Sequence, residues 1–324
     1  MFDQIVHQDH HALSPGSAFD HAFDWFFDRA WAWVAFTVIA AAGQTARNAM
    51  QRELTARLGA VGATHVRFLF GAPFALGLLA VVLSAAGAVP PRPAAQFWPW
   101  IVAGALTQVV ATALMLLAMT KRSFVVAIAY VKTEPIQVAV FGLVFLGDAL
   151  TLGSAAAIAV ATAGVVLMSQ QTGGKSQRQL RPVLLGLGAA SLFALSAVGY
   201  RGAILSLNAS NFIVAATFTL ALGLILQATL LSLYLAIRDR AVLMAIMRAW
   251  RPSLFAGAMG TLASENWFLA FALATAASVR TLGLIEIVFA QAVSRLVFKQ
   301  RTSLREAVGI CLITGAAIAL ILAA

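Results

Sequence analysis

Ten apolar stretches fill almost the whole chain after residue 30, and each is about long enough to cross a lipid bilayer. A hydrocarbon core of about 30 Å requires roughly 20 apolar residues in helical form. Because lipid offers no hydrogen-bonding partners, the backbone of each stretch must satisfy itself as a helix. The sequence therefore predicts an all-α, polytopic membrane protein with ten transmembrane helices, near residues 31–48, 60–83, 97–119, 123–146, 151–169, 182–201, 211–236, 252–274, 278–298 and 303–322.

The composition supports a membrane protein and leaves no room for a soluble domain. Of the 324 residues, 61% are hydrophobic and only 10% are charged, which is far from the usage of soluble domains. The net charge of +10 comes from Lys and Arg residues that flank the apolar stretches, and this is a membrane-topology signal. We therefore expect the lipid bilayer, and no nucleic acid, as a partner. A single cysteine, Cys311, excludes an intrachain disulfide.

The chain divides into a tail, two halves and a linker. Residues 1–30 form a polar N-terminal tail, and its last part is predicted to be an amphipathic interfacial helix near residues 18–33. Residues 170–181 are polar and Gly-rich and form the predicted linker. The linker separates a first five-helix half, residues 31–169, from a second five-helix half, residues 182–324. The helical spacing in the tail rests on Phe19, Phe23, Phe26, Ala30 and Trp33 against Asp20, Asp24 and Asp28.

The two halves resemble each other. Glu134 and Glu286 fall at similar depth in the fourth and ninth stretches, and each of these stretches is followed by a hydroxyl–Leu pair, at 151–152 and at 303–304. Two copies of an odd number of helices must insert in opposite orientations, which is the inverted-repeat architecture of many transporters. The alternative is chance similarity among helices rich in Ala, Leu and Val.

Most basic residues border the connectors that follow odd-numbered stretches, Arg47 among them. The positive-inside rule places these connectors in the cytoplasm and both termini outside. The basic residues assigned to the opposite side are Arg29, Arg92, Arg201 and Arg280.

The ionisable residues within the stretches are the strongest candidates for function, because charge in the membrane interior is costly. Lys132 and Glu134 stand near the middle of the fourth stretch, followed by Pro135, which removes a backbone donor. Residues two apart point to different sides of a helix, so one neighbour cannot satisfy both charges. One face of this helix is predicted to line a hydrated cavity, through Tyr130, Glu134, Gln137 and Phe141.

Other stretches add Arg67, Glu265 and Glu286, each away from the predicted helix ends. The slight excess of acidic groups means that one carboxyl group could carry a proton, as a proton-coupled carrier requires. The alternative is that these charges form structural ion pairs between helices. The predicted substrate-binding residues are Glu134, Lys132, Tyr130, Gln137, Arg67, Glu265 and Glu286.

Motifs of enzymes are missing from the sequence. It contains no His-Glu-x-x-His pair, phosphate loop, Gly-x-Ser-x-Gly elbow or dinucleotide fingerprint. The cluster His7, His10 and His11 is more typical of a polar tail than of a metal site. We therefore expect no enzyme activity, no cofactor and no metal. The sequence carries no signal for an oligomeric state.

Three features resemble the drug/metabolite transporter superfamily, EamA-type branch. They are the two five-helix halves, the Arg67-Phe68-Leu69-Phe70-Gly71-x-Pro73-Phe74 stretch, and Glu134-Pro135 followed by Phe145-Leu146-Gly147-Asp148-Ala149-Leu150-Thr151. Asp148 stands where the family usually has Glu, and Lys299-Gln300-Arg301 replaces the family's second Gly-Glu. Family members commonly have cytoplasmic termini, whereas the loop charges here favour the reverse. The resemblance covers roughly residues 31–322 and implies transport by alternating access, often export of metabolites, through a central cavity.

We therefore predict a secondary transporter in the cytoplasmic (inner) membrane that exports a small polar or amphiphilic metabolite such as an amino acid. One alternative is a lipid-active membrane protein, either a flippase or an embedded enzyme. The other is a non-transporting assembly or sensor subunit, in which the internal charges only hold helices together.

Overall fold

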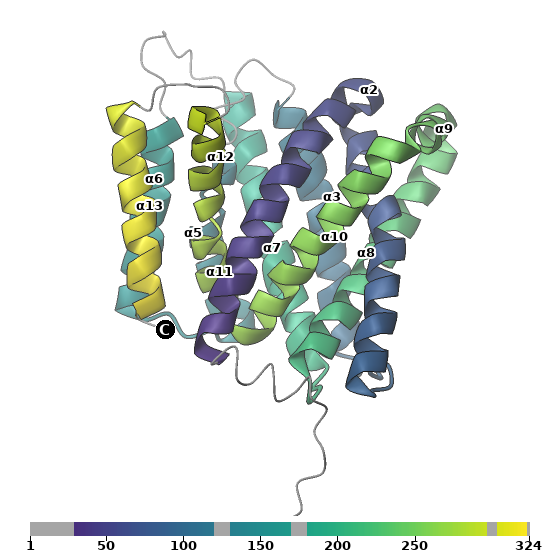
Figure 1. The fold of residues 1–324 in the computed structure, drawn as a ribbon, viewed down its shortest axis with the longest axis horizontal. Helices are drawn as coiled ribbons and strands as arrows, with labels where there is room; N and C mark the ends of the chain where they lie inside the picture. Colours follow the sequence, from purple (N-terminus) through teal and green to yellow (C-terminus); the bar gives the residue numbers. More distant parts are fainter. Residues whose placement is uncertain (1–28, 120–129, 170–179, 297–302, 323–324) are drawn as a thin grey trace, which may run out of the picture.

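The structure, a computed structural model, describes residues 29–119, 130–169, 180–296 and 303–322. These residues form helices joined by short connections, and no strand occurs among them (Figure 1). The elements are α2 (Arg29–Ala86), α3 (Phe97–Met119), α5 (Glu134–Phe141), the π-helical turn η1 (Gly142–Leu146), α6 (Leu152–Ser169), α7 (Leu180–Ser206), α8 (Phe212–Arg238), α9 (Arg240–Arg248), α10 (Trp250–Leu273), α11 (Ala276–Leu282), α12 (Ile285–Leu296) and α13 (Leu304–Leu322).

Helix α2 consists of two legs that meet at Gly59, residues 29–58 and 60–86. Gly59 has φ 71° and ψ 174°, a conformation that glycine adopts freely and L-residues rarely do. The two legs correspond to the first two predicted stretches. The first leg continues ten residues beyond the predicted end at residue 48, so residues 49–58 are helical and not a loop.

Five helices in the described part of the chain are long and apolar enough to cross a membrane. They are Leu54–Ala86, Phe97–Ala118, Leu184–Ser206, Phe212–Arg238 and Leu304–Leu322. Shorter apolar helices cover Glu134–Leu146 and Leu152–Met168. An all-helical, multi-pass membrane protein is thus confirmed. Side chains of Leu, Val, Phe and Ile are exposed over the outside of these helices, as expected for surfaces that face lipid.

Two further predictions, on the ninth stretch and on the segment 237–251 between the seventh and eighth stretches, were also wrong. The ninth stretch is not one helix, because α11 ends at Leu282 and α12 begins only at Ile285. The segment 237–251 is not a loop, because it contains the helix α9. Charged residues at both ends of α9, Arg240 and Arg248, lower its hydropathy. The apolar residues between them, including the fully buried Ile246, pack on the bundle.

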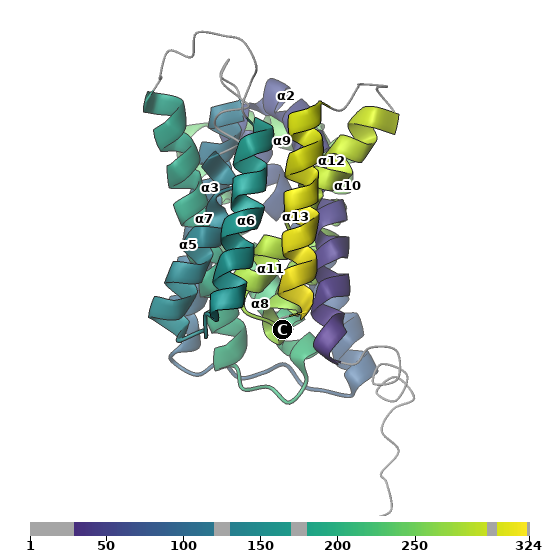
Figure 2. The ribbon, with the colours of Figure 1, turned by 90° about the vertical axis from the view of Figure 1, so that its left-hand side faces the viewer.

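Small residues let the helices approach one another closely. Helix α10 lies between the two legs of α2 (Figure 1), and a Cβ at Gly257 would lie 2.6 Å from the carbonyl carbon of Phe70. Helices α3 and α7 meet at Gly199, where a Cβ would lie 2.8 Å from the backbone nitrogen of Gly104. Helices α6 and α13 run side by side (Figures 1 and 2) and touch at Gly164. Close backbone approach of this kind is typical of helix packing in membranes.

Several predictions concern segments outside the described residues. These are most of the N-terminal tail with its amphipathic helix, residues 120–129 at the start of the fourth stretch, and most of the linker 170–181. The division into two halves remains a prediction.

Candidate functional site

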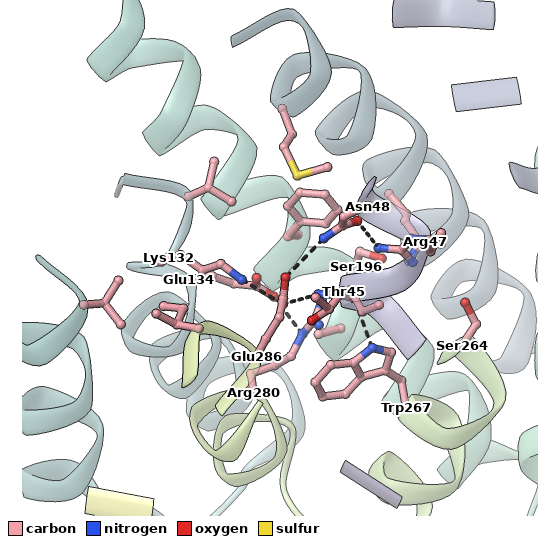
Figure 3. Close-up of a pocket in the computed structure, with 18 of the residues that line it drawn as sticks. Thr45, Arg47, Asn48, Lys132, Glu134, Ser196, Ser264, Trp267, Arg280 and Glu286 are labelled. Atoms are coloured by element: carbon pink, nitrogen blue, oxygen red, sulfur yellow. Dashed lines mark hydrogen bonds and ion pairs between the residues drawn. The ribbon is translucent and has the colours of Figure 1, made fainter. Parts of the chain in front are cut away.

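A cavity of about 490 Å³ lies between the helices. Side chains from both legs of α2, from α3, α7, α10, α11 and α12, and from the segment before α5 surround it (Figure 3). Its lining combines ionised and amide groups with aromatic rings. The cavity continues to Met168 and Glu306, which lie at the ends of α6 and α13.

The cavity lies beside two interruptions of the helical backbone. The chain turns at Lys132 and Thr133 before α5, and the Thr133 N–H and hydroxyl both donate to the Tyr130 carbonyl. Pro135 occupies the first turn of α5, where its missing N–H removes no helical hydrogen bond. A second interruption at Gly283 and Leu284 separates α11 from α12. The tertiary fold therefore places a helix start beside the cavity twice.

Each of the two interruptions is followed by a glutamate. Glu134 lies in the first turn of α5, and Glu286 lies in the first turn of α12. The free N–H groups of a helix start favour a negative charge. The helix starts therefore favour the charge of both carboxylates, in addition to their side-chain partners.

The two interrupted segments exchange ion pairs. Lys132 Nζ lies 2.9 Å from Glu286 Oε2, and Arg280 Nε lies 2.8 Å from Glu134 Oε1 (Figure 3). The first contact is also a hydrogen bond, whereas the second is an ion pair without hydrogen-bond geometry. The side chains are between 11% and 19% exposed, so solvent screens these pairs only weakly.

Helix α2 and helix α10 complete the surroundings of Glu286. Gln44 Nε2 donates to Glu286 Oε2 at 2.8 Å, and Asn48 Nδ2 donates to Oε1 at 3.1 Å. The indole N–H of Trp267 donates to Gln44 Oε1 at 3.1 Å. The Arg280 guanidinium lies 4.8 Å over the Trp267 ring, a cation–π arrangement. One connected network thus joins three parts of the chain far apart in sequence.

Two further arginines line the cavity from the two legs of α2. Arg47 is 4% exposed and Arg67 is 5% exposed. Arg47 Nη2 donates to Asn48 Oδ1 at 2.9 Å, and Arg67 Nη2 donates to Ser264 Oγ at 3.2 Å. Neither guanidinium has a carboxylate at ion-pair distance among the described residues.

Four of the seven predicted site residues line the cavity, namely Arg67, Lys132, Glu134 and Glu286. The other three do not. Gln137 accepts a hydrogen bond from Ser191 of α7, and Glu265 accepts one from Thr217 of α8. Tyr130 precedes the turn at 132–133 and contributes its backbone carbonyl to that turn.

The prediction that one helix face lines the cavity is therefore wrong. Of its four residues, Tyr130, Glu134, Gln137 and Phe141, only Glu134 lines the cavity. The turn at 132–133 breaks the helical register on which that face depended. The ring centroid of Phe141 instead lies 6.1 Å from that of Phe145, and Phe141 packs against the hydrophobic core.

Two charged site residues were missed because they fell at predicted helix ends and were counted among the residues that border connectors. Arg47 lies in the middle of a helix and is buried, and Arg280 lies within α11 and pairs with Glu134. For Arg47 a signal was available, because Gln44, Arg47 and Asn48 follow helical spacing on one face. For Arg280 no local pattern distinguishes a helix start from a loop.

Comparisons with known proteins show what the chain and its fold are similar to. Residues 31–170 match the EamA-like transporter family. No curated protein matches the chain. Twenty-five chains of solved structures match. One of them, a crystal structure, has a TM-score of 0.68 and 14% sequence identity, covering 91% of this chain and 96% of the other. That likeness shows a shared fold. Residues 31–170 are thus similar to the EamA-like transporter family, which supports a membrane transporter of the drug/metabolite type.

Proposed function

We propose that this protein is a secondary transporter that moves a small polar or amphiphilic metabolite by alternating access through the cavity in Figure 3. The observation that carries the proposal is the cavity itself, which places buried ionised groups beside open space at mid-depth. Its volume of about 490 Å³ falls within the range of small-molecule sites. Arg67, Lys132, Glu134 and Glu286 would contact the substrate.

The two interrupted segments support an architecture of two inverted five-helix halves. The turn at 132–133 and Glu134 in the first half correspond to the turn at 283–284 and Glu286 in the second. Interrupted helices that meet at mid-depth are typical of transporters built from inverted repeats. In such proteins one half rocks against the other, and the ion pairs between Lys132 and Glu286 and between Arg280 and Glu134 would have to adjust as it does.

Unequal ends of the cavity support alternating access. On the side of the connectors 170–179 and 297–302, the lining continues to the ends of α6 and α13. On the opposite side, Arg201 of α7 pairs with Asp148 at 3.2 Å and donates to the carbonyls of Phe271 and Ala274 at the end of α10. This Arg201 cluster would be the closed gate. With the connectors in the cytoplasm, as their charge indicates, the open side faces the cytoplasm, as export requires.

Neutralising Asp148 is expected to loosen that gate. The test uses a Cys311→Ser background with a cysteine placed at Ser278, which is partly buried beside Asp148. The rate at which a hydrophilic maleimide labels this cysteine would report opening of the gate. Losing about 1.4 kcal/mol of gate stability corresponds to a tenfold faster rate. We expect at least that increase in Asp148→Asn. Asp239→Asn, an exposed cap of α9, is the control; equal rates in all three proteins would contradict the gate.

The transport proposal is tested with purified protein in proteoliposomes and a library of radiolabelled metabolites. We expect saturable uptake of at least one compound, and a loss of tenfold or more in Glu134→Gln, because Arg280 then lacks its counter-charge. Membrane insertion should be unchanged. A transported compound should also raise the melting temperature of the wild type. If no compound enters faster than in empty liposomes and none protects the protein, the charges only hold helices together.

A further inference from the structure

Two buried guanidinium groups in the cavity have hydrogen-bond donors to spare. Nε and Nη1 of Arg47 and Nε of Arg67 are buried and have no acceptor in the described part of the chain. Their known partners, Asn48 and Ser264, are uncharged. Arg67 also lies 5.2 Å over the ring of Phe68, which compensates a charge only slightly. A buried arginine ordinarily has an anion beside it.

The described carboxylates that line the cavity do not supply that anion. Glu134 is paired with Arg280, and Glu286 is paired with Lys132. Glu306, at the end of the cavity, accepts the backbone N–H that begins its own helix. Four cations and two carboxylates therefore surround the inner part of the cavity, which carries an excess of two positive charges at the arginines from α2.

The fold brings these two arginines together. Both side chains cross α10 at the same residue, Gly260, where a Cβ would lie 3.3 Å from Cγ of Arg67 and 3.5 Å from Cδ of Arg47. Two like charges that share one neighbour repel each other. An anion held between them would remove that repulsion and fill the vacant donor positions at once.

The rest of the lining fits the remainder of such a ligand. The hydroxyl of Ser196 is buried, lines the cavity and has no partner among the described residues. An apolar body would be received by aromatic side chains on α7 and α10, namely Phe193, Trp267, Phe268 and Phe271. Among the described residues, no unpaired carboxylate in this part of the cavity is available for an ammonium group.

We infer that Arg47 and Arg67 form an anion subsite, and that the substrates are small organic anions with a carboxylate or phosphate on an apolar body. This inference rests on the proposed transport function and narrows its substrate class. It favours net anions over the zwitterionic amino acids that the sequence suggested as an example. The anion is a soluble metabolite and not the headgroup of a lipid.

The test is a series of ligands that share one shape and differ in charge. Binding of 3-phenylpropionate, 3-phenylpropionamide and 3-phenylpropylamine to the purified protein in a neutral detergent is measured by isothermal titration calorimetry, with phenyl phosphate as a second anion. We expect at least one of the two anions to bind tenfold or more tightly than the amide, and the amine to bind most weakly. Equal affinities for the amide and the anions, or no anion binding, would overturn the subsite.

Variants assign the effect to the two arginines. Arg47→Gln and Arg67→Gln should each weaken anion binding about tenfold or more and leave amide binding unchanged. Arg240→Gln, at an exposed position on α9, is the matched control. Where a glutamine variant does not elute as a single species, Arg67→Lys and Ser196→Ala replace it, with expected losses of a few fold. Anion binding that survives these changes would place the subsite elsewhere.

Two further experiments are needed. One distinguishes a soluble anion from a lipid headgroup, and the other distinguishes the anion subsite from the transport proposal. The titration is repeated in nanodiscs of phosphatidylcholine with and without phosphatidylglycerol, and displacement of the aryl anion by the anionic lipid would indicate a headgroup site and overturn the inference. Anion binding without uptake in proteoliposomes would leave the subsite standing and refute transport. Uptake of neutral or cationic compounds at full rate in Arg47→Gln would leave the transport proposal standing and refute the anion subsite.

Discussion

Replacing Glu286 by leucine is expected to destabilise the protein by about 3 kcal/mol or more and to abolish transport. The change leaves Lys132 as an uncompensated charge at a partly dehydrated position, and breaking such a pair by removing one partner typically costs about 3–5 kcal/mol. It also removes the acceptor of Gln44 and Asn48, which hydrogen-bond the same carboxylate. Thermal unfolding of the purified protein and uptake by proteoliposomes measure the two effects.

Exchanging the charges of Lys132 and Glu286 tests whether their mutual attraction stabilises the protein, or whether a glutamate is required at position 286 for another reason. The double variant Lys132→Glu with Glu286→Lys restores opposite charges across the 2.9 Å contact. We expect it to recover at least half of the lost melting temperature, though not transport, because the new carboxylate lies next to Glu134 and away from α2. A double variant no more stable than Glu286→Leu would show that attraction between these residues contributes little.

Gly257→Ala is expected to destabilise the protein by about 1–3 kcal/mol, the usual range for forcing an extra group into a well-packed interior. The added Cβ would lie 2.6 Å from the backbone carbonyl carbon of Phe70, and a backbone atom cannot turn aside as a side chain can. Helix α10 would have to move away from the second leg of α2, which carries Arg67. Uptake should therefore fall together with the melting temperature.

Gly77→Ala is the matched control for this substitution. It lies on the second leg of α2, and a Cβ there meets nothing within 4 Å. Alanine is about 1 kcal/mol more favourable than glycine within a helix, so this variant should be neutral or slightly more stable. Equal melting temperatures in the two variants would contradict the close approach of α10 and α2.

Much of the fold follows from the sequence, because hydropathy over about 20 residues identifies helices that must lie in lipid. The interior positions of Glu134, Glu286 and Arg67 could be predicted in the same way, since charges there stand out against apolar neighbours. The linear pattern was less informative about helix ends. It located the end of an apolar run at residue 48, whereas the first leg of α2 continues to residue 58. Arg47, predicted to lie at a helix end beside a connector, is therefore buried within the helix.

The turn at 132–133 explains the other errors. Helical periodicity predicts which side of a helix a residue lies on only while the helix continues. An interruption changes the direction of every side chain that follows it. Gln137 therefore lies against Ser191 and not in the cavity. Glu265 shows a related limit, because its depth in α10 was predicted, yet its side chain turns to Thr217 of α8, away from the neighbouring Ser264. The depth of a residue in the membrane can be predicted from sequence more readily than the direction in which its side chain points.

By itself the sequence determined that this chain enters a membrane as helices and that a few charges lie within them, because lipid penalises exposed backbone and unpaired charge at every position alike. Only the tertiary structure decided which charges meet. Lys132 pairs with a residue 154 positions away. Arg47 and Arg67 converge at Gly260, and no described carboxylate pairs with either of them. Such pairings depend on how helices are rotated and packed against one another, and no local pattern encodes that geometry.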